Sequence, residues 1–228
     1  MPTLADTMAE LESYGKPNYR KIYARHGIGD NLFGVAYSDL KPMAKRIKTD
    51  HALALALWDT DNYDARILAT MIADPKQATP DMLEHWVTTH DNYGLSDAVS
   101  GFAARTPHAK AKAEVWSQQA DEWISTSGWN LLGQLALNDK TLPDSYFERY
   151  LEQIQHEIHG RPNRTRYAMN NVVIAIGTRG PALEGKAIAA ATAIGDINID
   201  HGETGCKTPE ACSYIRKTVE RKGYLVGA

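Results

Sequence analysis

The segment 163–180 reads NRTRYAMNNVVIAIGTRG, and it decides between a mixed fold and an all-helical one. Its apolar run Val172–Ile176 has the length and the branched side chains of a short buried strand. Residues 166–171 before the run and Gly177 after it instead continue a helical pattern. A buried helix over 163–178 is therefore the prediction, and no other segment shows sustained alternation with period two.

Helix signals recur along the rest of the chain. Thr79-Pro80, Thr106-Pro107 and Thr208-Pro209 each pair a capping threonine with a proline at the first helical position. Ser38-Asp39 is a further capping pair, and Gly160 and Gly223 are stop signals. We expect helices at 3–14, 17–26, 38–48, 51–58, 61–73, 80–89, 93–105, 107–119, 121–138, 143–159, 163–178, 181–195 and 209–222. Short helices joined by short turns predict an all-α, HEAT-like solenoid of stacked antiparallel helix pairs with degenerate repeats.

The composition is that of an ordinary globular protein. The 228 residues are 43% hydrophobic and 23% charged, which is enough for one domain with a sizeable core. No apolar run reaches the length of a membrane span, and the N-terminus lacks a signal-peptide pattern. Only Cys206 and Cys212 are present, so no disulfide framework is expected. These features predict a cytoplasmic protein.

Charge is unevenly distributed along the chain. The net charge is −3, yet residues 49–100 alone carry −7. Residues 160–182 contain four arginines and no acid. Such a local cluster can neutralise phosphates on an acidic protein, since screening makes nearby charges dominate. A solvated basic helix face would give the same pattern, and both interpretations stay open.

Several blocks, in order along nearly the whole chain, resemble the AlkD-like DNA alkylation repair proteins. They are LFGVAYSDLKPMAKRIK (32–48), ALWDTDNYDARILATMIADP (56–75), WVTTHDNYGLSDAVSGFAARTP (86–107), LALNDK (135–140), NRTRYAMNNVVIAIGTRG (163–180) and IGDINIDHGETGCKTPEACSYIRKT (194–218). The resemblance implies one HEAT-repeat domain over 1–228, with a C-terminal loop and helix (about 196–228) closing the array. It also implies a curved solenoid whose basic concave face binds double-stranded, damaged DNA and needs no metal or nucleotide cofactor. The sequence does not determine the oligomeric state, and a monomer is the expectation.

Better-known members of that family are glycosylases that excise cationic N3- or N7-alkylated purines. Their aspartate falls on Asp97, and the tryptophan that precedes it by four residues falls on Tyr93. Their arginine falls on Thr126, and their late tryptophan falls near Asn171. The resemblance therefore implies Asp97 and Tyr93 as catalytic residues, and a divergent member that lacks two hallmark side chains.

The chemistry of Tyr93 and Asp97 suits such a reaction. Departure of a cationic purine builds positive charge on the sugar, which a fixed carboxylate stabilises and an aromatic face attracts. Residues four apart share one face of a helix. The alternative is structural: Asp91 or Asn92 caps the helix, Tyr93 packs and Asp97 pairs with a basic neighbour.

The candidate DNA-binding residues are Arg164, Arg166, Asn170, Arg179 and Trp129. Arginine and asparagine can hold phosphate oxygens without reading sequence. Trp129 follows the Thr126 position closely and could line the same cleft. Most of the five tryptophans, at positions 58, 86, 116, 123 and 129, are expected to pack in the core.

The C-terminal segment offers a metal-like set: Asp200, His201, Glu203, Cys206 and Cys212. Its spacing matches no standard zinc pattern. We expect an ordered loop over 200–207 with Cys206 buried as a small apolar group.

Three functions remain open from the sequence. The first is a DNA glycosylase that uses Asp97, and the second is a HEAT-like module that binds DNA without cutting it. The third is a scaffold for protein partners, favoured by the acidic segment 49–100.

Overall fold

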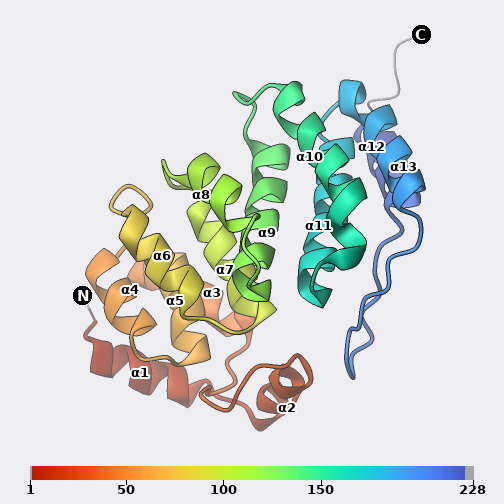
Figure 1. Ribbon diagram of the computed structural model, residues 1–228. Coiled ribbons are helices and arrows are strands. Elements are labelled where there is room, and N and C mark those ends of the chain that lie inside the picture. The colour runs from red at the N-terminus through yellow and green to blue at the C-terminus, as the bar shows by residue number, and fades with distance from the viewer. Residues whose placement is uncertain (1, 224–228) are drawn as a thin grey trace. The chain divides into compact units, whose positions relative to one another are not determined.

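The computed structural model describes residues 2–223, and within them every regular element is a helix (Figure 1). The α-helices are α1 Leu4–Ser13, α2 Pro17–Arg25, α3 Tyr37–Ile47, α4 His51–Trp58, α5 Tyr63–Ile72, α6 Pro80–Thr88, α7 Tyr93–Ala103, α8 Ala109–Trp116, α9 Glu122–Asn138, α10 Asp144–Glu157, α11 Asn163–Gly177, α12 Pro181–Ile194 and α13 Ala211–Lys222. A short 3-10 turn, Ile158–Gly160, follows α10. The predicted helices are thereby confirmed, including the helix over the apolar run Val172–Ile176.

Some predicted start signals act differently from expectation. Thr79 caps α6 as predicted, since its side chain accepts from the Met82 N–H. The prediction that Ser38-Asp39 caps α3 is wrong: the helix already begins at Tyr37, and its N-cap Ala36 makes no side-chain bond. The predicted start of the last helix at Thr208-Pro209 is also wrong. The helix begins at Ala211, because Glu210 caps α13 with both carboxylate oxygens.

The helices gather into two compact units. Unit 1 comprises residues 1–108 and 201–205, and unit 2 comprises residues 109–200 and 206–228. The short segment 201–205 is thus part of unit 1 although the residues on both sides of it belong to unit 2. Within unit 1, Gly202 lies near the carbonyl oxygen of Arg25, and the Thr204 hydroxyl donates to the His201 carbonyl at 2.8 Å.

Unit 1 has a core of stacked aromatic rings. Trp58 and Trp86 are fully buried and stack with ring centroids 4.4 Å apart, and Phe102 packs against Trp86 at 5.1 Å. Arg66 lies over the Trp58 ring and donates to two backbone carbonyls of the neighbouring turns. Asp64 is also buried, and its carboxylate accepts the backbone N–H groups of residues 33, 34 and 35 at 2.7–3.0 Å. These bonds fix the loop that leads into α3.

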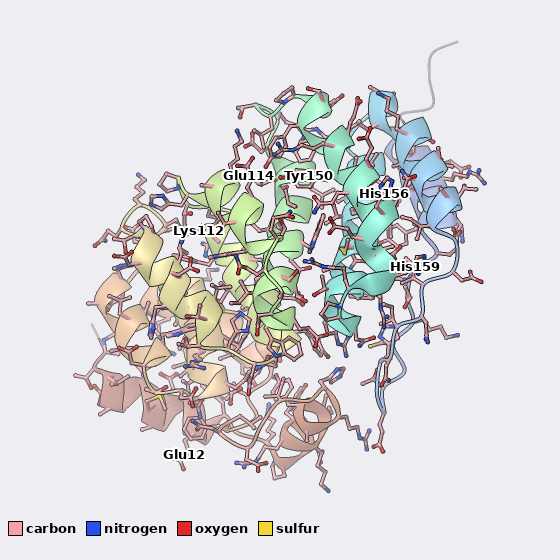
Figure 2. All side chains as sticks on the ribbon, viewed as in Figure 1. Glu12, Lys112, Glu114, Tyr150, His156 and His159 are labelled. Carbon is pink, nitrogen blue, oxygen red and sulfur yellow. The ribbon has the colours of Figure 1, made fainter. Side chains whose placement is uncertain are left out.

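Unit 2 is built around α9, which packs against α8 and α11. α10 contributes Tyr150, whose ring meets the buried ring of Trp129 edge-on, and Arg149, which pairs with Glu114 of α8 at 2.8 Å (Figure 2). His159, labelled in the same view, hydrogen-bonds the carbonyl of Ile194 at the end of α12. The ion pair links α10 to α8, and the His159 bond links the turn after α10 to the end of α12.

Among residues 2–223, none of the helices combines the length and the apolar character that a membrane span requires.

Candidate nucleic-acid interface

The candidate site in unit 1 begins at the start of α7. The side-chain oxygen of Asn92 accepts from the Leu95 N–H at 3.0 Å, which fixes Tyr93 as the first residue of the helix. Gly94 follows, and a Cβ there would lie 2.6 Å from the hydroxyl oxygen of Tyr63. Glycine therefore leaves room for the buried Tyr63 ring of α5 against the first turn of α7, so capping and packing together set the position of Tyr93.

Tyr93 and Asp97 lie one helical turn apart, as predicted from their spacing. Tyr93 is half-buried, and its hydroxyl is hydrogen-bonded to Nδ1 of His26, the residue directly after α2. Asp97 is exposed. The structure therefore brings an aromatic ring and a carboxylate to one face of α7, beside the end of α2.

Tyr37 is a neighbour that the sequence did not single out. It is 41% exposed at the start of α3. Burial of its hydroxyl raises the pKa of Tyr37, the hydroxyl of Tyr63 beside it lowers that pKa, and the negative charge of Asp97 raises it. Tyr37 of α3 is therefore close enough to feel the charge of Asp97, which itself lies one helical turn after Tyr93 on α7.

A cationic surface on α2 was also missed. No acid occurs between Glu12 and Asp30, and Arg20, Lys21 and Arg25 are exposed on this short helix. We call these three residues the α2 cationic face. Lys21 and Arg25 form no ion pair within the described part of the chain. The acid-free run between Glu12 and Asp30 could have indicated this surface from the sequence. The net negative charge of the chain, which comes mainly from residues 49–100, drew attention away from it.

Arg164 and Arg166 stand at the start of α11, in unit 2. Both are half-buried. The backbone N–H of Arg164 donates to Glu122, and the Arg166 guanidinium reaches the Asn163 side chain at 3.5 Å. That these two arginines bind DNA stays a prediction.

The other three residues predicted to contact DNA, Trp129, Asn170 and Arg179, have buried side chains. Trp129 is completely buried and packs on Tyr150, so its ring presents no surface to a ligand. Asn170 is 3% exposed and donates to the carbonyl of Pro209, anchoring the segment that leads into α13. Arg179 is enclosed by backbone carbonyls, with a side chain that is 6% exposed. All three have structural roles.

The two hallmark positions also lie in unit 2. Thr126 is buried, and its hydroxyl lies 3.5 Å from that of Thr165. Asn171 is half-buried and lines a groove of about 380 Å³ with Tyr167 and Tyr214. Neither position carries a cation or an indole ring.

The C-terminal loop differs from expectation at Cys206, which is exposed rather than buried. The described residues contain no group of three or more His, Cys, Asp or Glu side chains arranged to hold a metal ion.

The chain is similar to several known proteins. Residues 7–215 match the family model described as "DNA alkylation repair enzyme". The chain is 30% identical over 227 residues to the uncharacterized protein Lin0241 of Listeria innocua, and the match covers 97% of this chain and 99% of that one. It is 29% identical to the uncharacterized protein Lmo0209 of Listeria monocytogenes, with the same coverage.

One solved structure is similar over 97% of this chain and 95% of its own, with 32% identity and a TM-score of 0.90. It is described as "a new family of proteins related to the HEAT-like repeat DNA glycosylases with affinity for branched DNA structures". This similarity confirms the all-helical, HEAT-like fold. With a family match over residues 7–215, the chain belongs to the DNA alkylation repair enzyme family.

Proposed function

We propose that this protein binds branched DNA through the α2 cationic face and the aromatic side chains next to it, without breaking a bond in the DNA. The observation that carries the proposal is the pair of exposed cations without ion-pair partners among the described residues, Lys21 and Arg25, on the helix that ends beside Tyr93. Cations that are not neutralised by the protein itself can replace the counterions of a phosphate backbone.

The aromatic side chains support a preference for branch points. A branch leaves the terminal base pairs of its arms open to stacking, and exposed aromatic rings stack on bases regardless of sequence. Tyr37 and Tyr93 lie on helices of the same unit as the α2 cationic face. The affinity for branched DNA described for the similar solved structure points in the same direction.

The residues at the family's hallmark positions favour binding over excision. In the resemblance to the glycosylases, the arginine position is Thr126, which is buried and uncharged. Excision of an alkylpurine depends on placing charge where the transition state develops it. With one carboxylate retained and the arginine and tryptophan positions changed, binding is the function that the residues support best.

Replacing both Lys21 and Arg25 by alanine is expected to weaken binding to a four-way junction by about 10- to 100-fold at moderate salt. The slope of log Kd against log salt should fall by about 2, one for each phosphate that the variant no longer neutralises. Fluorescence anisotropy with labelled junctions and linear duplexes of equal length measures both quantities.

The matched control is Lys76→Ala with Lys140→Ala, which removes the same charge from two exposed lysines outside α2. Equal weakening in the two double variants would contradict an interface on α2, and equal affinity of the wild type for junction and duplex would contradict the branch preference.

The second candidate is a glycosylase, and the exposure of Asp97 one turn from Tyr93 favours it. In that reaction the N-glycosidic bond breaks and its electron pair leaves with the purine, which thereby becomes neutral. Water then adds at the sugar C1′ and loses a proton to the solvent. The wild type should then release N3-methyladenine or N7-methylguanine from methylated duplex DNA. Asp97→Asn should lower that rate by about 100-fold or more.

The same variant separates the two candidates. If the protein only binds DNA, Asp97→Asn should keep or increase junction affinity, because it removes a charge that repels phosphate. Absence of base release by the wild type would exclude the glycosylase.

A further inference from the structure

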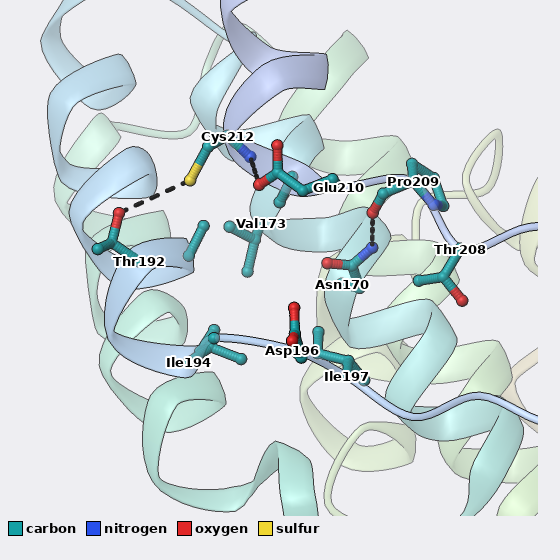
Figure 3. Close-up of a pocket in the computed structure, with 13 residues that line it drawn as sticks. Asn170, Val173, Thr192, Ile194, Asp196, Ile197, Thr208, Pro209, Glu210 and Cys212 are labelled. Carbon is teal, nitrogen blue, oxygen red and sulfur yellow. Dashed lines mark hydrogen bonds between the residues drawn. The ribbon is translucent and has the colours of Figure 1, made fainter.

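A cavity of about 440 Å³ lies within unit 2, between α11, the end of α12 and the start of α13 (Figure 3). Its volume is in the range of sites that take small molecules. Apolar side chains form part of the wall, among them Val173, Ile194 and Ile197. The remainder of the wall is polar, and its charged groups have one sign.

The first of the polar groups is Asn170, which is 3% exposed. Its amide nitrogen donates to the Pro209 carbonyl at 3.0 Å, and this bond fixes the orientation of the amide. The other end, Oδ1, points into the cavity and receives no hydrogen bond from the described residues (Figure 3). An amide oxygen accepts hydrogen bonds, so this group suits a ligand that brings an N–H group.

The second group is Asp196, just after α12. Its carboxylate also points into the cavity, and it forms no hydrogen bond or ion pair with the described residues (Figure 3). Glu210 adds a second negative charge from the opposite wall. Within residues 2–223, no lysine or arginine lines the cavity. The site therefore presents two carboxylates and one amide oxygen, and no cation.

Two other classes of ligand fit poorly. An anion would be drawn to the N-terminus of α13, but Glu210 already occupies it, accepting from Cys212 N at 2.9 Å and from Ser213 N at 2.7 Å. A tightly coordinated metal ion needs several converging ligands, and the described residues hold no such group. An organic cation satisfies both the charge and the apolar wall.

We infer that this cavity binds a small aliphatic diamine or amino-guanidine. One cationic head would donate to Asn170 Oδ1 and Asp196, the second would pair with Glu210, and the methylene chain would lie on the apolar wall. Two positive charges match the two carboxylates of the wall. This inference does not depend on the proposed binding of DNA.

The test uses putrescine as the probe and 1,4-butanediol as its uncharged counterpart of similar size. Titration of the full-length protein, followed by NMR of isoleucine and valine methyl groups, should show saturable shifts at Val173, Ile194 and Ile197 with putrescine and none with the diol. Asp196→Asn should weaken binding by about tenfold or more. Because the Asp196 side chain is exposed and bonds to none of the described residues, this variant should fold normally.

The matched control is Asp81→Asn, an exposed acid of α6 in the other unit. It should leave putrescine binding unchanged. Equal weakening by the two variants would show that putrescine acts as a diffuse counterion, which would overturn the inference. Shifts confined to other methyl groups, or equal binding of the diol, would also overturn it.

Discussion

Replacing Arg179 by methionine is expected to lower the free energy of unfolding by about 3–5 kcal/mol. The guanidinium donates to the carbonyls of Ala136, Asp139 and Leu142 at 2.6–2.9 Å and pairs with Asp144 at 3.0 Å. It also lies over the Phe147 ring at 4.5 Å. Methionine fills a similar volume but leaves three carbonyl oxygens without the donors that Arg179 provides, and unsatisfied buried acceptors are costly.

Urea unfolding followed by circular dichroism measures this decrease as a lower midpoint at unchanged slope. The control is Lys186→Met, which breaks the exposed ion pair with Glu148 and should cost less than about 1 kcal/mol. A decrease of similar size in both variants would contradict the structural role assigned to Arg179.

The second large effect is expected at Gly128 in α9. A Cβ there would lie 2.1 Å from the backbone nitrogen of Ser117 and 2.5 Å from the carbonyl carbon of Trp116. These atoms belong to the backbone at the end of α8 and cannot rotate away. Gly128→Ala should therefore cost about 3 kcal/mol or more, although alanine is the better helix former.

Gly185→Ala in α12 is the matched control, because nothing lies within 4 Å of its added Cβ. That substitution should raise the free energy of unfolding by about 0.5–1 kcal/mol. The opposite signs of the two alanine substitutions test the close approach of α8 and α9. If Gly128→Ala were also stabilising, the approach would be contradicted.

The helices could be predicted because their signals are local. Apolar spacing, caps and glycine stops lie within a few residues of the elements that they define, as at Thr79 and Gly223. The exact starts were less predictable where two signals compete. At Thr208-Pro209, the carboxylate of Glu210 reaches two N–H groups and moves the start of α13 to Ala211.

The candidate site was only partly predictable. The face shared by Tyr93 and Asp97 follows from helical spacing, whereas Tyr37 and His26 reach it from elements more than fifty residues earlier in the chain. The predicted role of Arg179 failed for the same reason. Its carbonyl partners lie 37–43 residues away, so a count of charges along the chain could not reveal that they enclose it.

Membership of residues 201–205 in unit 1 has a consequence for biosynthesis. A chain emerges from the ribosome N-terminus first, and its domains commonly fold in that order. Here the helices α1 to α7 are available early, but the last segment of their unit is made only after α8 to α12. Unit 1 therefore reaches its complete form only after residues 201–205 have been made, and a chain cut after residue 108 would lack part of it.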